Sequence, residues 1–246
     1  MGSSSAERAS FATTARLLSC LVTESLVRAI FVPLQWSDCV GIGVVLNAPV
    51  ATTIPTHNCK QEGDDVLAIV LLRHVPVLKT DSGDEPRGKE IGLLDPLDMF
   101  PLVLVISGDG ESPCENEVCF IFSISFLGLY SETRCAAPQL LLSAVRRVFS
   151  SPCWSLSEQT IIKELNDPLV LWDTFATTIN IDPATRSDIS DELASSMRWQ
   201  TYSYDHPPNA PTFLSPSIDW EQSIVEGHPT HPVRVSSVPT HKEVAN

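Results

Sequence analysis

Two Asp-Pro pairs determine where helices can begin in the second half of the chain. Aspartate caps a helix N-terminus well, and proline suits the first helical position because its missing N–H would have no partner there. Helices are therefore predicted to follow Asp167-Pro168 and Asp182-Pro183. Ser215-Pro216 predicts one more helix, and Gly227 suits the C-terminal turn of that helix.

The first half of the chain has a different pattern, with short apolar runs in which β-branched residues are prominent. Val40 to Val50, Val66 to Leu72 and Leu102 to Ile106 are each predicted to form a strand. An earlier stretch, Thr13 to Ile30, carries apolar residues at three- and four-residue spacings, which predicts an amphipathic helix. Strands in the first half and mostly helices in the second predict an α+β fold.

The segments between these two parts are less regular. A helix is predicted over Gln139 to Phe149, and a capping-box pattern at Ser155 and Glu158 predicts another over Thr160 to Leu165. Residues 111–137 hold three cysteines beside an abrupt apolar run. They form either a buried strand or an irregular insertion, and the sequence leaves both interpretations open.

The domain organisation is expected to be simple, because 246 residues suit one large domain or two small ones. Residues 13–232 are assigned to one domain, with residues 111–137 as its candidate insertion. Residues 1–12 are expected to form a disordered N-terminus, and residues 233–246 a divergent tail.

The charge balance argues against nucleic acid as a partner. The chain carries 16 Lys and Arg against 30 Asp and Glu, a formal net charge of −14, whereas phosphate-backbone binding relies on clustered Lys and Arg.

Seven cysteines without a C-x-x-C pair indicate a reduced protein, for which a cytoplasmic location is expected. The longest apolar run, Val118 to Tyr130, falls short of the about 20 residues that a membrane helix needs, so no membrane partner is expected.

Generic nucleotide-binding and hydrolase motifs are absent from the sequence. It contains no G-x-x-x-x-G-K-[ST] phosphate loop, no H-E-x-x-H metal motif and no G-x-S-x-G nucleophile turn. The informative segment that remains lies near the C-terminus and reads Glu226-Gly-His-Pro-Thr-His-Pro232.

Each of the two histidines in this segment precedes a proline. A following proline disfavours helical geometry and pushes His228 and His231 toward extended or polyproline conformations. Polyproline geometry has three residues per turn and a rise of about 3.1 Å, so both imidazoles would lie on one face with their backbones about 9 Å apart. Imidazoles held in this way can donate hydrogen bonds to phosphate or carboxylate groups and stabilise charge on a transferring phosphate. A helix that ends near Gly227 would favour the charged imidazolium through its dipole.

Two other interpretations of the segment stay open at this point. One is a metal site, but Pro229 opposes the helical turn that would bring the two histidines together, and no nearby Cys or Glu-x-x-His completes a ligand set. No metal ligand is therefore assigned. The other interpretation is a solvent-exposed, proline-rich tail with incidental histidines.

The longer segment from Ser215 to Pro232 (SPSIDWEQSIVEGHPTHP) resembles the signature of the NRPS-independent siderophore synthetases, the aerobactin-synthetase (IucA/IucC) family. In that family a G-H-P-x-H-P core is followed closely by a lysine and an arginine. Ala15 to Arg28 is similar to the opening helix of the family, and Trp172 to Asp205 fits the approach to the signature. The resemblance identifies the chain as the N-terminal part of such a synthetase.

The resemblance implies a ligase that serves siderophore biosynthesis and iron acquisition. Family members use ATP and Mg²⁺ to activate citrate or a related dicarboxylic acid as an acyl-adenylate. An amine or hydroxyl of a polyamine or amino-acid derivative then attacks, giving an amide or ester. Their fold resembles a cupped hand, of which this chain would form the thumb-like portion, and full-length relatives are expected as homodimers. Carried onto this chain, Gly227, His228 and His231 would border the ATP phosphates, with His228 as the catalytic candidate.

The chain departs from the family pattern after Pro232. Arg234 and Lys242 do not fall where the family has its lysine and arginine, and the half that supplies the Mg²⁺ ligands and the acid pocket does not follow. A truncated chain that is inactive alone is therefore expected. The alternative is a non-catalytic fragment or binding module that retains a partial nucleotide site.

Overall fold

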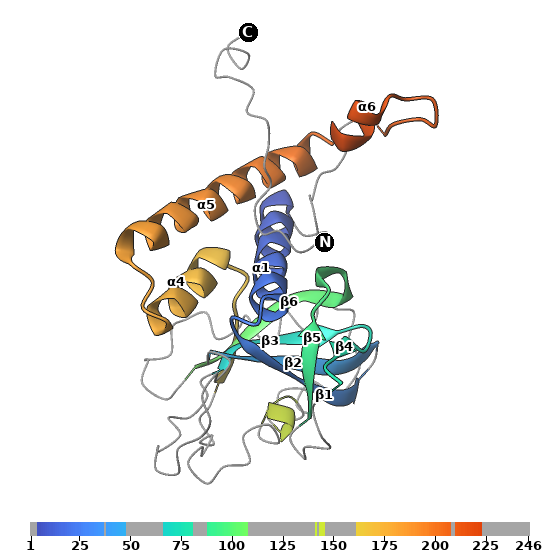
Figure 1. Ribbon diagram of the computed structural model, residues 1–246. Helices are drawn as coiled ribbons and strands as arrows, with labels where there is room; N and C mark the ends of the chain where they lie inside the picture. Colours follow the sequence, from blue (N-terminus) through green and yellow to red (C-terminus); the bar gives the residue numbers. More distant parts are fainter. Residues whose placement is uncertain are drawn as a thin grey trace.

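The computed structural model describes residues 4–36, 38–47, 66–80, 88–107, 141, 143–145, 161–207 and 210–222. Seven strands in this part of the chain form one antiparallel sheet in the order β4-β5-β1-β2-β3-β6-β7 (Figure 1). The strands are β1 (Arg28–Trp36), β2 (Cys39–Leu46), β3 (Val66–Leu72), β4 (Val77–Leu78), β5 (Lys89–Leu93), β6 (Met99–Ser107) and β7 (Ile161–Glu164). The predicted α+β class is confirmed.

The centre of the sheet is buried on both faces. All residues of β2 except Val40, and all residues of β3 except Val66, are buried. Neighbouring side chains on a strand point to opposite faces, so these two strands need apolar cover on both sides. This is why their sequences are continuous apolar runs without polar alternation.

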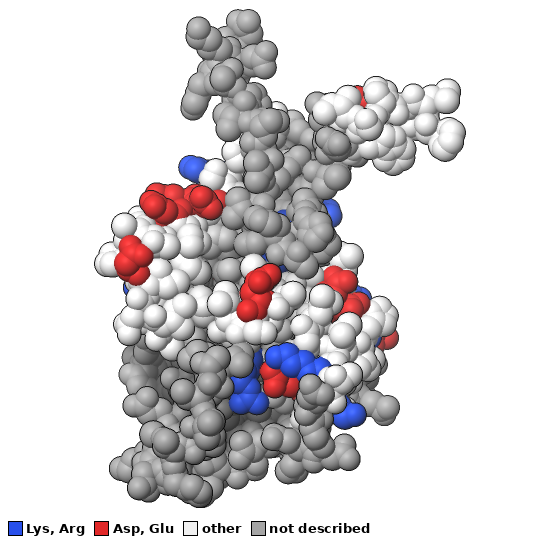
Figure 2. Space-filling view, viewed as in Figure 1, with Lys and Arg blue, Asp and Glu red and all other residues white. Residues whose placement is uncertain are grey.

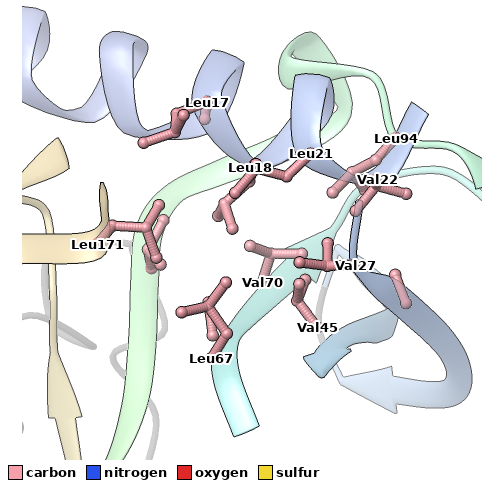
Figure 3. Close-up of a cluster of buried hydrophobic side chains, with 14 of the residues drawn as sticks. Leu17, Leu18, Leu21, Val22, Val27, Val45, Leu67, Val70, Leu94 and Leu171 are labelled. Atoms are coloured by element: carbon pink, nitrogen blue, oxygen red, sulfur yellow. The ribbon is translucent and has the colours of Figure 1, made fainter. Parts of the chain in front are cut away.

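Helix α1 (Ser5–Thr23) covers one face of the sheet. Its side chains Leu18, Leu21 and Val22 point toward Val45 of β2 and Val70 of β3 (Figure 3). Full burial of an aliphatic side chain of this size stabilises the fold by about 1.5–3 kcal/mol. The apolar stripe of α1 is therefore the main cover of this face.

Helices α4 (Pro168–Thr178) and α5 (Pro183–Asp205) extend the same layer. Leu171 and Phe175 of α4 and Leu193 of α5 are fully buried in the cluster that α1 forms with the sheet. The indole N–H of Trp172 donates to the Arg186 carbonyl at 3.1 Å and so ties the two helices together. The predicted starts of both helices are confirmed.

A second apolar cluster lies on the opposite face of the sheet. Leu141, Ala144 and Val145 pack there against strand residues that alternate with those of the first face: Ile30, Val32, Ile42, Val44, Ile69 and Leu71. Leu141 and residues 143–145 are helical, in agreement with the helix predicted over Gln139 to Phe149 where that segment is described. The sheet thus lies between helical segments on both sides.

The two Asp-Pro caps have the predicted geometry. The Asp167 carboxylate accepts a hydrogen bond from the Leu169 N–H at 2.9 Å, and the Asp182 carboxylate accepts one from the Thr185 N–H at 3.0 Å. The pKa of Asp182 is lowered from its ordinary value, first by a hydrogen bond from the Thr185 side chain and then by the backbone N–H of the same residue. Both bonds favour the charged form of the cap.

The helix predicted over Thr13 to Ile30 is wrong at both ends. The observed helix begins at Ser5, and a capping box joins Ser4 and Glu7. Residues 5–12 are therefore helical, whereas the sequence predicts a disordered N-terminus there. It ends at Thr23, and β1 begins at Arg28.

A Schellman motif without glycine ends α1. Ser25 has a positive φ of 57°, and the N–H groups of Ser25 and Leu26 bond back to the carbonyls of Val22 and Leu21 at 3.0 and 2.9 Å. The C-terminal end of α1 is not predicted from the sequence, because serine stands where glycine is usual and because Leu26 and Ala29 continue the helical spacing.

The helix predicted over Thr160 to Leu165 is also wrong, because Ile161–Glu164 forms β7. Its residues pair with β6, from Leu104 opposite Glu164 to Ser107 opposite Ile161. Without β7, strand β6 would present an unpaired edge, and two consecutive isoleucines favour a strand. Pairing with β6 therefore overrides the local helix signal. Ser155 and Glu158, like residues 111–137, lie outside the described residues.

Replacing Ser25 by glycine is expected to raise the free energy of unfolding by about 0.5–1 kcal/mol. Relief of left-handed strain, about 1–2 kcal/mol, exceeds the extra chain entropy of glycine, about 0.5–1 kcal/mol. Urea denaturation measures the change. The matched control is Ser187→Gly in the exposed interior of α5, which is expected to lower stability by about 0.5 kcal/mol. Destabilisation by Ser25→Gly would contradict the assigned helix end.

Candidate functional site

The predicted site residues Gly227, His228 and His231 lie outside the described residues, so the geometry of the two imidazoles stays a prediction. The structure does describe the elements that lead to them. These are the C-terminal half of α5, the connection after it and helix α6 (Ser217–Gln222). The start of the segment that resembles the family signature therefore has a defined place in the fold.

The C-terminal end of α5 carries an aromatic stack. The Tyr202 ring stacks on His206 with their centroids 4.4 Å apart, and the His206 backbone N–H bonds to the Tyr202 carbonyl at 2.8 Å. Trp199 meets Tyr202 edge-on at a centroid distance of 6.3 Å. The last turn of α5 is thus held by its own side chains.

A tight turn connects this end to α6. The Ser215 N–H donates to the Thr212 carbonyl at 2.9 Å, and the Ser215 hydroxyl accepts from the Thr212 N–H at 3.0 Å. Helix α6 begins two residues later, which confirms the helix predicted to follow Ser215-Pro216. The first residues of the signature-like segment therefore start from a hydrogen-bonded turn.

A buried polar seam joins α1 to α5 and so fixes the direction in which α5 leaves the core. We define the seam as Thr13, Arg16 and Ser19 of α1 with Ser196 and Gln200 of α5, all buried. Arg16 is only 3% exposed. When the Gln200 amide is oriented to satisfy its neighbours, its oxygen accepts from Arg16 Nη1 and Nη2 at 2.9 and 3.0 Å, and its nitrogen donates to Thr13 Oγ1 at 3.2 Å.

This seam is not among the features predicted from the sequence. Arg16 stands in an apolar helical pattern, where a charged residue is usually on the solvent side. A signal was nevertheless available, because Thr13, Arg16 and Ser19 recur every three residues on α1, and Ser196 and Gln200 are four apart on α5. Matching polar stripes on two helices indicate a polar helix contact.

Several charged side chains on the described surface form ion pairs with one another. Glu90 lies 2.6 Å from Lys79 and 3.9 Å from Arg28, and Arg186 Nε donates to Asp173 at 2.8 Å. Figure 2 shows that the main group of basic atoms on the visible face lies beside acidic ones. Exposed pairs of this kind add little stability, and they leave these basic side chains engaged with carboxylates.

Cys20 and Cys39 are free thiols in the described part of the chain. Burial raises the pKa of both, and Glu24 raises that of Cys20 further. Backbone hydrogen bonds with Gly41 and Leu72 oppose the effect at Cys39 without reversing it. Both thiols therefore stay protonated at neutral pH and do not fit the role of an activated nucleophile.

Neither a metal cluster nor a membrane helix occurs in the described ranges. No three His, Cys, Asp or Glu side chains lie together there in a way that could hold a metal ion. No helix in those ranges is long and apolar enough to cross a membrane.

Comparison with known proteins finds similarity to a siderophore synthetase. The chain is 30% identical over 237 residues to the NRPS-independent siderophore synthetase rfs of Rhizopus delemar, in an alignment that covers 92% of this chain and 33% of the relative. The chain thus spans about a third of the length of the relative that it matches. No protein-family model and no solved structure matches the chain.

Replacing Gln200 by leucine is expected to lower the free energy of unfolding by about 2–3 kcal/mol, because the buried Arg16 guanidinium loses two charge-assisted hydrogen bonds. Urea denaturation measures the loss. The matched double variant Arg16→Met/Gln200→Leu removes the charge together with its acceptor and should be less destabilised than Gln200→Leu alone. A double variant at least as unstable as the sum of both single variants would contradict the proposed pairing.

Proposed function

Because the chain belongs to the NRPS-independent siderophore synthetase family, we propose that it serves siderophore biosynthesis as the N-terminal portion of an ATP-dependent ligase. The observation that carries the proposal is the 30% identity to the Rhizopus delemar synthetase across 92% of this chain. The G-H-P-x-H-P core at residues 227–232 supports it independently, since the segment fits a phosphate-binding role on its own chemistry. The cytoplasm, where ATP is abundant, is the proposed location.

The proposed reaction joins an acid to an amine or alcohol in two steps. A carboxylate oxygen of citrate or a related dicarboxylic acid attacks the α-phosphorus of ATP, and pyrophosphate leaves to give an acyl-adenylate. The nitrogen or oxygen of a polyamine or amino-acid derivative then attacks the acyl carbon, its proton is lost, and AMP leaves. The product is an amide or an ester.

His228 and His231 are proposed to act on the phosphates in the first step. Negative charge moves toward the leaving pyrophosphate, and donors aimed at that charge stabilise the transition state. The two prolines would fix the directions of the imidazoles before ATP arrives, so little ordering would be needed on binding. Gly227 is proposed to let the backbone approach the phosphates closely.

Mg²⁺ is proposed to accompany ATP, where it would neutralise phosphate charge. The described residues show no group of three or more potential ligands placed for a metal ion. No ligand and no step is therefore assigned to Mg²⁺ within this part of the chain. Its ligands are proposed to come from the portion of a synthetase that this chain does not match.

A second candidate function is a binding module that retains only part of a nucleotide site. The coverage favours this candidate, since the alignment spans 33% of the relative. The two candidates differ in what the chain does when the portion of a synthetase that it does not match is supplied. A ligase portion gains turnover, whereas a pure binding module does not.

The 246-residue chain alone is expected to release no pyrophosphate from ATP with Mg²⁺, citrate and a polyamine, because most of the proposed substrate contacts would lie outside it. A coupled pyrophosphate assay measures this, with cooperative urea unfolding as the control that the chain is folded. Turnover by the purified chain would contradict the proposal that it needs a complementary portion.

A chimera in which this chain replaces the matched third of the Rhizopus delemar synthetase tests the histidines. His228→Ala in the chimera is expected to lower kcat for pyrophosphate release by about 100-fold, as loss of one transition-state hydrogen bond does, with unchanged thermal stability. His74→Ala, which removes an exposed imidazole beside Asp98, is the matched control and should retain full turnover. Normal turnover by His228→Ala would refute the assigned role.

A further inference from the structure

The connection between α5 and α6, together with α6 itself, exposes four large apolar side chains within eight residues. Phe213 is 96% exposed, Leu214 90%, Ile218 51% and Trp220 49%. We call these four residues the apolar tip. In Figure 1 the tip and α6 extend beyond the end of α5, away from the sheet, and in Figure 2 the same region is almost free of charged atoms.

The tip is held in an exposed position by its backbone. The Ser215 N–H bonds to the Thr212 carbonyl at 2.9 Å, which places Phe213 and Leu214 at the two corner positions of a tight turn. Such corners normally carry Gly, Asn, Asp, Ser or Pro. Two large apolar residues at the corners leave apolar surface in water, and covering that surface would be favourable.

No core within the described part of the chain uses the tip. The two apolar clusters of the sheet include no residue after Leu193. From Ser196 onward, the residues that α5 buries are polar, namely Ser196 and Gln200. Phe213 and Leu214 therefore lie outside both apolar cores of the described fold.

The size of the tip decides which partner fits it. Its side chains expose on the order of 500 Å², counting about 150–250 Å² for each large side chain. A stable complex of separate proteins buries about 800 Å² on each partner, which is more than the tip offers. Contacts between domains of one chain can be smaller, because the tether supplies an effective concentration in the millimolar range.

We propose that the apolar tip is a docking surface for the portion of a siderophore synthetase that this chain does not match. The Rhizopus delemar relative carries such a portion, since the alignment covers only 33% of its length. Docking at the tip would hold that portion beside α6, where the segment with His228 and His231 begins. The inference rests on the same family relationship as the proposed function but not on the adenylation chemistry.

Hydroxyl-radical footprinting tests the docking directly. Phe213 and Trp220 are expected to be oxidised about threefold more slowly in the chimera than in the 246-residue chain, because interface cores exclude water. Leu97, 71% exposed on the η1 turn (Pro96–Asp98), is the matched control and should react equally in both. Buried Phe175 should stay protected in both, which shows that each protein is folded.

Three outcomes would overturn the proposal. The first is an equal oxidation rate of Phe213 and Trp220 in the two folded proteins. The second is protection that appears in the 246-residue chain as its concentration rises, which would assign the tip to a second copy. The third comes from Phe213→Ser/Leu214→Ser in the 246-residue chain, which should leave the urea midpoint unchanged; a lower midpoint would place the tip in this chain's own core. None of these measurements requires turnover, so they stay separate from the activity test.

Discussion

The burial of both faces of the central strands is the constraint on which the rest of the structure depends. Strands β2 and β3 have almost no polar side chain to present to water, so the sheet is stable only between two apolar layers. α1 supplies the cover on one side with Leu18, Leu21 and Val22. Once α1 is in place, its remaining side contacts α5, and that contact sets the direction of α5.

The character of α5 changes along its length in a way that bears on function. Its first half buries Leu193 in the core, and its second half buries Ser196 and Gln200 against the seam that includes Arg16. Beyond it the chain exposes Phe213 and Leu214. From the sheet toward the signature-like segment, the chain thus buries less and less of its own apolar surface. Such a gradient suits a protein whose functional residues work against another surface.

Much of the fold was predictable because local signals agreed with the tertiary structure. Asp167 and Asp182 cap helices as their Asp-Pro pairs indicate, and the apolar runs in β2 and β3 are strands. The errors have two causes, a distant contact in one case and a local backbone conformation unusual for its residue type in the other. Ile161 joins the sheet because β6 has a free edge, which no local pattern reveals. Ser25 ends α1 in a conformation that usually requires glycine.

One part of the candidate site is predicted from the sequence, and another part is not. Its chemistry is predicted from two His-Pro pairs, since proline acts on its immediate neighbour, and that prediction concerns residues outside the described ranges. The Arg16–Gln200 pair is not predicted, because it joins residues 184 positions apart. His228 and His231 are proposed to form a phosphate cradle, for which a structure of the chimera with bound ATP is the decisive test. An imidazole nitrogen of each histidine is expected within about 3 Å of a phosphate oxygen. Imidazoles that point apart into bulk water, with the phosphates bound elsewhere, would contradict it.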